Sequence, residues 1–297
     1  MNTATDNVKS VVSQISSLPT LPRVVQRVVA LVEDPDTSPA CLARTISSDS
    51  SLVSKILKVA NSAYYGLSRK VSTITQATVI LGFNTIKNLV LTTSVFTVFN
   101  GNNKSNRFDH EGFWSHSLGC ATASKIISKQ IRLGPPEEAF LAGLLHDIGK
   151  IVLDQFLHDQ FEKVLDLVED QKLRIRDAEK VILGADHSEI GAWLCDKWNF
   201  PEHLQESVAF HHSPAAANSK MVALVHIADA LAHKENIGNG VDNLEREIDP
   251  GSLELLNIEA KDLEEMTKYF QDEFNKASIF LELMNGRSTN LEVNPMG

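Results

Sequence analysis

The chain has 297 residues, of which 43% are apolar, enough to form a hydrophobic core in one large domain or two ordinary ones. Its formal charge of -10, from 28 basic and 38 acidic residues, argues against a general affinity for a nucleic-acid duplex or an anionic membrane, because that affinity requires clustered Lys and Arg. Small phosphorylated ligands remain compatible with this composition.

Cysteine usage and the apolar segments indicate the compartment. The three cysteines are odd in number, widely spaced and without a CxxC pattern, which is typical of reduced thiols. The first ten residues lack the apolar core of a signal peptide. The most apolar stretch, 79–99, is interrupted by two asparagines and a lysine, so we predict a buried helix there rather than a membrane span. We expect a cytoplasmic protein.

Helical periodicity dominates the first hundred residues. After a turn at Leu18–Pro22, valines recur at intervals of three and four, and serines precede two further apolar runs. The helices predicted here begin near Val24, Ser38 and Ser48 and then cover 74–81 and 86–99. No stretch alternates in the way that a strand requires. We therefore predict a helical N-terminal lobe over residues 1–100.

A second helical lobe is predicted over residues 111–285. The Gly- and Asn-rich stretch 101–110 is the expected connection between the lobes, and 286–297 is expected to be a C-terminal tail. A long helix over 111–131 carries His116 on its apolar stripe. Further helices are predicted at 160–169, 176–183, 188–198, 201–212, 220–233 and 260–283. The predicted fold is thus all-α, with two lobes, the second of which is a helical bundle.

The segment Glu137–Leu153, EEAFLAGLLHDIGKIVL, is the most informative part of the sequence. Its apolar helical run ends in His146-Asp147, just before Gly149. Buried His and Asp are unfavourable unless they are hydrogen-bonded or bind a metal ion. Since successive helical residues diverge by about 100°, this helix end could contribute ligands to two neighbouring ions.

The histidines separate into two groups when they are placed on the predicted helix faces. Five fall on or beside apolar stripes: His116, His146, His187, His211 and His212. The others lie among polar neighbours or are ambiguous: His110, His158, His203, His226 and His233. Asp229 also falls on an apolar face. One such residue alone would be a satisfied core residue, but five histidines and two aspartates together predict a site for zinc, iron, manganese, cobalt or nickel.

The chain contains, in this order, His116, His146-Asp147, His187, His211-His212 and Asp229. This series resembles the ligand set of the HD superfamily of metal-dependent phosphohydrolases. The resemblance implies two ions bridged by Asp147. The first ion would be held by His116, His146, Asp147 and Asp229, and the second by His187, His211, His212 and Asp147. We expect divalent iron or manganese ahead of zinc, cobalt or nickel.

The N-terminal half narrows this resemblance. It contains LPTLP at 18–22, SDSSLVSKILKVANSAYYG at 48–66 and ATVILG at 77–82. These segments resemble the HDOD family (HD-related output domain), a bacterial signal-transduction module, and the likeness extends over about residues 15–231. HDOD domains are regarded as HD relatives whose catalytic function is lost or undemonstrated.

The chain differs from the related HD-GYP phosphodiesterases of cyclic di-GMP. It has HDIGK at 146–150, but no GYP segment follows His211-His212, and only 17 positions separate His212 from Asp229. That spacing leaves no room for the usual long substrate loop. Gly112 stands one turn before His116, where some HD-GYP proteins have a further glutamate ligand. We therefore do not expect hydrolysis of cyclic di-GMP.

Three hypotheses follow from these residues. In the first, the chain is a regulatory output module that binds a signalling protein, and its metal centre is structural or sensory. In the second, it is a metal-dependent phosphohydrolase or phosphodiesterase of a nucleotide-type substrate, with Asp147 bridging the ions and Lys150 facing phosphate. Lys150 could equally be a solvated lysine at a helix C-terminus. In the third, the histidines form a metal-free polar network, which would leave many buried donors and acceptors unpaired.

Overall fold

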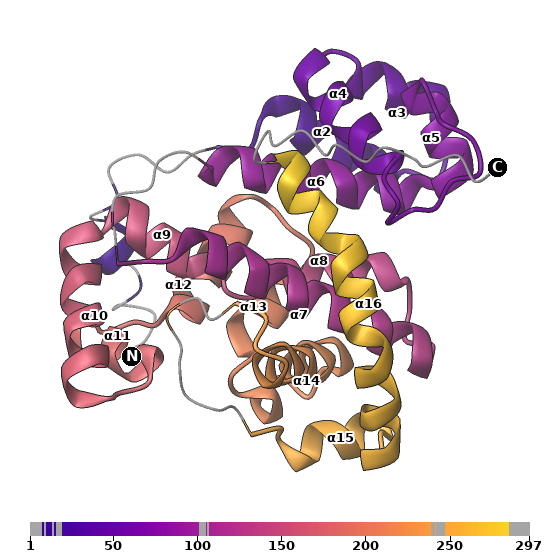
Figure 1. The fold of residues 1–297 in the computed structure, drawn as a ribbon. Helices are drawn as coiled ribbons and strands as arrows, with labels where there is room; N and C mark the ends of the chain where they lie inside the picture. Colours follow the sequence, from indigo (N-terminus) through magenta and orange to yellow (C-terminus); the bar gives the residue numbers. More distant parts are fainter. Residues whose placement is uncertain are drawn as a thin grey trace. The chain divides into compact units, whose positions relative to one another are not determined.

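The computed structural model describes residues 8, 10–13, 15, 20–100, 105, 107–238, 241 and 247–284. Within these residues the chain forms fifteen α-helices, α2 to α16, one short 3-10 helix, η1, and no strand (Figure 1). The prediction of an all-α fold is therefore confirmed. None of the helices described is both long enough and apolar enough to cross a membrane. The predicted tail, residues 101–104 and 106 of the predicted connection, and Leu18-Pro19 lie outside the described residues.

Contacts between helices divide the chain into two compact units. Of the described residues, those in 22–100 and 272–284 form the small unit, and those up to 21 and in 101–271 form the histidine unit. Helix α16, Ala260–Met284, contributes residues to both units. The predicted lobe boundaries, drawn as continuous segments of the chain, remain a prediction.

The small unit contains five helices and the C-terminal part of α16. The five are α2 (Arg23–Glu33), α3 (Pro39–Ile46), α4 (Ser50–Ala60), α5 (Ile74–Leu81) and α6 (Phe83–Phe99). Three of them begin at residues whose side-chain oxygens accept a hydrogen bond from a backbone N–H three positions later, namely Ser38, Asp49 and Thr73. Gly82, with φ 87, turns the chain between α5 and α6. The five predicted helices are confirmed, and the last one begins three residues earlier than predicted.

Asn61 fixes the loop that follows α4. Its Nδ2 atom donates to the carbonyl oxygens of Leu57 and Val71, each at 2.8 Å, and its Oδ1 atom accepts from the Val71 N–H at 2.7 Å. Three hydrogen bonds from one side chain tie the end of α4 to the segment that leads into α5. The asparagine of the NSAYYG segment is therefore a structural residue.

The histidine unit is the larger one and contains the predicted metal ligands. Its helices are α7 (His110–Ile131), α8 (Pro136–Leu145), α9 (Ile148–Phe156), α10 (His158–Gln171), α11 (Ile175–Leu183), α12 (His187–Lys197), α13 (Glu202–Phe210), η1 (Pro214–Ala216), α14 (Lys220–Lys234), α15 (Pro250–Leu256) and the first half of α16. Helix α7 packs against α8 and α14, and α12 packs against α9 and α13. The sequence did not predict α9 as a separate helix, and it did not predict α15.

Candidate metal centre

His146 and Asp147 lie at a break between two helices. The sequence predicted that the helix from Glu137 ends at His146-Asp147, and α8 does end at Leu145. A second helix, α9, which was not predicted, begins at Ile148. Asp147 forms the junction with φ -100 and ψ 11, and both side chains are fully buried. The N-terminal end of α9 favours a negative charge at this position because of the helix dipole.

Lys150 lies one turn into α9, with its Nζ atom 2.6 Å from Asp147 Oδ2. Its side chain is only 1% exposed. The interpretation of Lys150 as a solvated lysine at a helix C-terminus is therefore wrong, because the residue lies in the first turn of a new helix and is buried. The ammonium group neutralises a carboxylate that burial would otherwise disfavour.

Helices α9 and α12 approach each other at two glycines. A Cβ atom on Gly149 would lie 1.9 Å from the His187 carbonyl oxygen, and one on Gly191 would lie 3.1 Å from the Gly149 nitrogen. A side chain at Gly149 would therefore collide with backbone. This close approach places His187, the first residue of α12, with its Nε2 atom 3.2 Å from Asp147 Oδ1.

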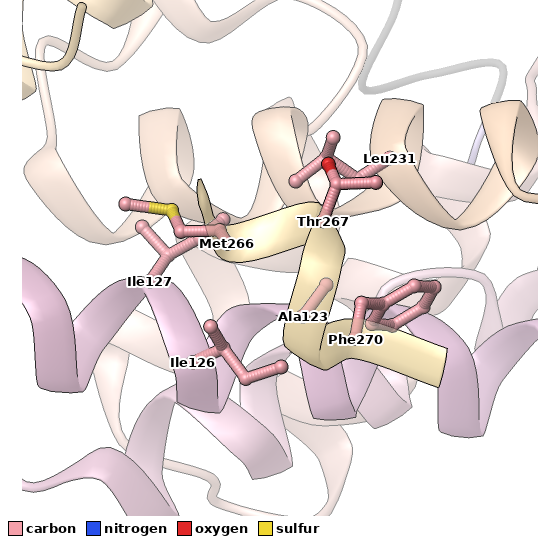
Figure 2. Close-up of a pocket in the computed structure, with 7 residues that line it drawn as sticks. All are labelled: Ala123, Ile126, Ile127, Leu231, Met266, Thr267 and Phe270. Atoms are coloured by element: carbon pink, nitrogen blue, oxygen red, sulfur yellow. The ribbon is translucent and has the colours of Figure 1, made fainter. Parts of the chain in front are cut away.

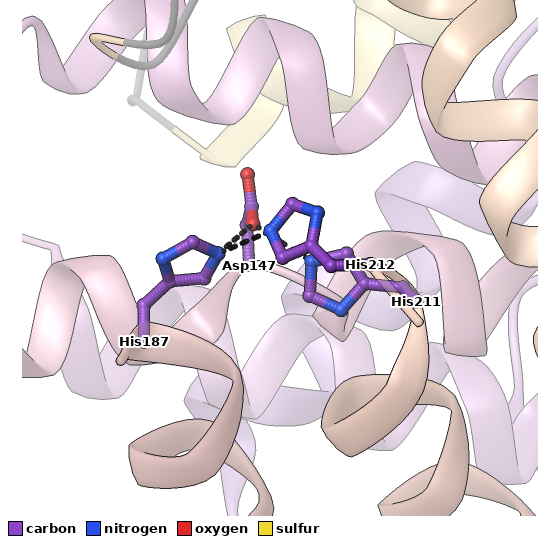
Figure 3. A group of neighbouring side chains, drawn as sticks. All are labelled: Asp147, His187, His211 and His212. Atoms are coloured by element: carbon purple, nitrogen blue, oxygen red, sulfur yellow. Dashed lines mark hydrogen bonds and ion pairs between the residues drawn. The ribbon is translucent and has the colours of Figure 1, made fainter. Parts of the chain in front are cut away.

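The C-terminal end of α13 supplies His211 and His212. Helix α13 ends at Phe210, so His211 is its capping residue. The Nε2 atom of His211 lies 3.4 Å from Asp147 Oδ1, and the Nε2 atom of His212 lies 2.8 Å from that of His187. Figure 3 shows the three imidazoles gathered around the Asp147 carboxylate. One ligand atom from each of these four residues lies within 4.8 Å of the others.

Helices α7 and α14 supply residues on the other side of Asp147. The Nε2 atom of His116 lies 2.9 Å from Asp229 Oδ1, and the Nε2 atom of His146 lies 3.5 Å from the same oxygen. His146 Nε2 is also 3.3 Å from Asp147 Oδ2. Asp147 Oδ1 therefore faces His187 and His211, whereas Oδ2 faces His146. A carboxylate that bridges two ions requires such an arrangement.

Three of the histidines hold their Nδ1 atoms away from the centre. The Nδ1 atoms of His146 and His211 lie 2.7 and 2.8 Å from the carbonyl oxygens three residues earlier. Because a carbonyl oxygen only accepts, each of these Nδ1 atoms carries a hydrogen. His187 Nδ1 lies 2.7 Å from the Glu179 carboxylate and donates to it in the same way. The Nε2 atoms are thereby directed at the centre, in the tautomer with which imidazole binds a metal.

The centre contains polar atoms that the protein alone does not satisfy. Among the described residues, His146 Nε2, His211 Nε2 and Asp147 Oδ1 are buried and make no hydrogen bond of good geometry. A buried polar atom without a partner is unfavourable, and divalent cations bound on the two sides of Asp147 would satisfy all three. The structure brings together all seven predicted ligands, and their atoms fit a divalent transition metal. The number of ions, their identity and the role of each ligand remain predictions.

The protonation states of these residues are strongly perturbed. Burial lowers the pKa of His211 to about 3, so this ring is neutral. Burial also acts to lower the pKa of His146, but the adjacent Asp147 carboxylate outweighs it and raises the pKa to about 10. At His187 the Glu179 carboxylate likewise outweighs burial and raises the pKa to about 9. A metal cation that binds here would displace protons from these two rings.

Glu179 of α11 contacts a predicted ligand and was not predicted from the sequence. This residue is fully buried, and its Oε2 atom accepts from both the backbone N–H of His187, at 2.8 Å, and the ring Nδ1 of His187, at 2.7 Å. A carboxylate in this position fixes the orientation and the tautomer of a metal-binding histidine. The available signal was that Glu179 follows Ile175 by four residues and so shares the apolar face of α11.

Arg176, one turn earlier on α11, connects the two segments that carry His187 and His212. Its Nε atom donates to Asp186 Oδ2 at 2.6 Å, and its Nη1 atom donates to Ser213 Oγ at 3.3 Å. Asp186 also caps α12, accepting from a backbone N–H in its first turn. Helix α11 thus holds the start of α12 and the turn after His212 at fixed positions.

Two histidines that were predicted to lie among polar neighbours flank a buried acid instead. His110 Nε2 lies 3.0 Å from Asp154 Oδ2, and His158 Nδ1 lies 3.9 Å from Asp154 Oδ1. The Asp154 side chain is fully buried, and that of His110 is 12% exposed. These residues are absent from the groups of three ligand atoms found in the described part of the chain.

A small pocket of the histidine unit lies between α7, α14 and α16 (Figure 2). The residues that line it are Ala123, Ile126, Ile127, Leu231, Met266, Thr267 and Phe270. One hydroxyl and no charged group occur among them. The pocket therefore offers no recognition for a phosphorylated ligand, and the His/Asp cluster is the better candidate site.

Glu179→Gln is expected to weaken metal binding about 10- to 100-fold, because an amide lacks the charge that orients and polarises the His187 ring. The measurement is an anaerobic titration of the metal-free protein with Mn²⁺. Asp177→Asn, which changes an exposed acid of the same helix, is the matched control. Equal affinities for the two variants and the wild type would contradict the role assigned to Glu179.

The HDOD domain family matches residues 18–214 of this chain. The match takes in more than half of the chain and includes six of the seven predicted ligands, from His116 to His212.

Two curated proteins are similar to this chain over part of their length. An uncharacterized protein of Treponema pallidum (strain Nichols) is 24% identical over 209 residues, which make up 69% of this chain and 39% of that protein. Ribonuclease Y of Mycoplasma mycoides is 30% identical over 118 residues, which make up 40% of this chain and 21% of that protein. The chain therefore spans less than half the length of these relatives.

Two solved structures are similar to nearly the whole chain. An HDOD domain protein of unknown function from Geobacter sulfurreducens is 25% identical, with a TM-score of 0.77 and a match that covers 96% of this chain and 97% of that one. A Shewanella amazonensis SB2B protein with a suggested phosphohydrolase activity is 26% identical, with a TM-score of 0.73. That match covers 94% of this chain and 98% of the Shewanella protein. By the family match over residues 18–214 and the fold it shares with these proteins, the chain belongs to the HDOD family.

Proposed function

We propose that the chain is a regulatory output module of bacterial signal transduction, built around a dinuclear metal centre in the histidine unit. One observation supports the metal centre most directly. His146, His187 and His211 each bond through Nδ1 to a group outside the centre, and this directs their Nε2 atoms at the buried Asp147 carboxylate. One ion would be held by His116, His146, Asp147 and Asp229 and the other by His187, His211, His212 and Asp147. Imidazole and carboxylate ligands suit iron, manganese, zinc, cobalt and nickel, and we expect iron or manganese ahead of the other three.

Two features of the histidine unit support binding rather than turnover. The Nζ atom of Lys150 lies 2.6 Å from Asp147 and its side chain is buried, so it is already occupied in neutralising that carboxylate. The stretch between His212 and α14 is short, and η1 at Pro214–Ala216 occupies part of it. The bound ions would supply concentrated positive charge, which suits a small phosphorylated or nucleotide ligand. The protein partner would be a signalling protein.

The second candidate function is a metal-dependent phosphohydrolase or phosphodiesterase acting on a nucleotide-type substrate. It is favoured by the donor set and by the activity suggested for the Shewanella amazonensis relative. In this function Asp147 would hold both ions and Lys150 would be the nearby cation. Two ions held by one carboxylate stabilise charge on a phosphoryl group in such enzymes.

The two functions differ in the rate of hydrolysis. The full-length protein, reconstituted anaerobically with Mn²⁺ or Fe²⁺, would be assayed against nucleotides and model phosphodiesters, with Asp147→Asn as the control. The regulatory function predicts turnover far below the ~1 to 10³ per second that is typical of enzymes. Hydrolysis at an enzyme-like rate that the Asp147→Asn variant abolishes would contradict it and establish the second function.

A further inference from the structure

The histidine rings of the centre form a continuous row that extends beyond the seven predicted ligands. Distances between the centroids of neighbouring rings along the row are 4.9 Å for His187 and His212, 4.0 Å for His212 and His211, 5.0 Å for His211 and His146, and 5.4 Å for His146 and His116. The row then continues to His233, whose ring centroid lies 4.8 Å from that of His116. His233 belongs to neither of the two ligand groups that the resemblance implies.

Helix α14 presents His233 on the same face as Asp229. The two residues are four positions apart, so their side chains are neighbours on the helix surface. Asp229 and His116 are each 1% exposed, and the Nε2 atom of His233 is buried. One ligand atom from each of His116, Asp229 and His233 lies within 4.8 Å of the others, as in the two groups that include Asp147. Two imidazoles and one carboxylate form a donor set that suits a divalent transition metal.

We propose that His233 is a further metal ligand, which binds the same divalent ion as His116 and Asp229. The proposal rests on the metal centre proposed above and adds a ligand to it. Three ligands of the ion at this end of the row would then come from α7 and α14. The sequence did not reveal this role, because Lys234 and Glu235 follow His233 and give it polar neighbours.

The competing role for His233 is packing against the His116 ring, and two variants separate the roles. His233→Gln removes the imidazole and keeps a polar side chain. His233→Phe keeps an aromatic ring beside His116 and removes both nitrogen atoms. His203→Gln is the control, because His203 lies on α13 with its side chain 37% exposed. The full-length metal-free proteins would be titrated anaerobically with Co²⁺, with binding followed by calorimetry and the coordination number followed by the visible absorption of cobalt.

The proposal predicts that both His233 variants bind one of the ions about 10-fold or more weakly, with a changed cobalt spectrum, while the other ion binds as in the wild type. The His203 control should match the wild type. Wild-type affinities and spectra in either folded His233 variant would overturn the role of His233 and leave the dinuclear centre in place. A wild-type protein that binds no ion would contradict both proposals.

Discussion

Gly149→Ala is expected to destabilise the protein by more than about 3 kcal/mol, a cost at or beyond the upper end for overpacking. The added Cβ would lie 1.9 Å from the His187 carbonyl oxygen, 2.7 Å from its carbonyl carbon and 2.9 Å from the Gly191 nitrogen. All three are backbone atoms, so no rotamer change relieves the collision. Helices α9 and α12 would have to separate, and Asp147 would move away from His187.

The measurement for Gly149→Ala is chemical denaturation, with metal content determined on the same samples. Gly251→Ala is the matched control, because Gly251 is exposed and the nearest atom to its added Cβ is a carboxylate oxygen at 3.1 Å. We expect the control to unfold within about 1 kcal/mol of the wild type. If Gly149→Ala were equally stable and retained its metal, the close approach of α9 and α12 would not be needed to assemble the centre.

Asp147→Ala is expected to cost about 3 to 5 kcal/mol of unfolding free energy in the metal-free protein, the usual result of breaking a buried ion pair. The substitution removes the carboxylate that lies 2.6 Å from the Lys150 ammonium and 3.2 Å from His187 Nε2. Lys150 would then remain buried without this partner. The same variant should also fail to bind either ion, because Asp147 lies in both of the ligand groups around it.

The double variant Asp147→Ala/Lys150→Met separates these two effects. Methionine fills a volume similar to that of the lysine side chain without its charge, so the double variant should recover more than half of the lost stability. It should still bind no metal, because the bridging carboxylate is absent. Denaturation curves of the wild type and both variants, measured in the presence of a chelator, provide the test. A double variant no more stable than Asp147→Ala would show that the ion pair is not the source of the loss.

The elements with strong periodicity could be predicted from the sequence, and those that depend on tertiary contacts could not. The apolar stripe of α7 and the capped starts of α3 and α4 are local signals, and the structure has these helices where they were predicted. The helix end at His146-Asp147 was also predicted, with Gly149 as its signal, but the start of a new helix, α9, at Ile148 was not. Helix α9 packs against α12 through the close approach of Gly149 and Gly191, which lie more than forty residues apart and give no local signal.

The same division applies to the candidate site. The seven predicted ligands could be picked out because buried histidine and aspartate on apolar helix faces are unusual. Glu179 and His233 were not predicted, since a single acid or histidine near polar neighbours has an ordinary surface interpretation, and the only signal for Glu179 was its spacing from Ile175. Their positions are set by the way α11 meets α12 and α14 meets α7, which one sequence does not reveal. Lys150 was placed at a helix C-terminus because α9 was not predicted as a separate helix.

The most direct test of the metal centre is elemental analysis of protein purified without a metal-affinity tag and reconstituted anaerobically with Fe²⁺ or Mn²⁺. Asp147→Asn, in which a neutral amide of the same size replaces the carboxylate, would be measured beside the wild type. Our account predicts about two ions per wild-type chain, as in other paired-metal sites, and their loss in the variant. A wild-type protein that is fully folded and contains no transition metal after reconstitution would contradict it, and the histidines would then form a polar core without an ion.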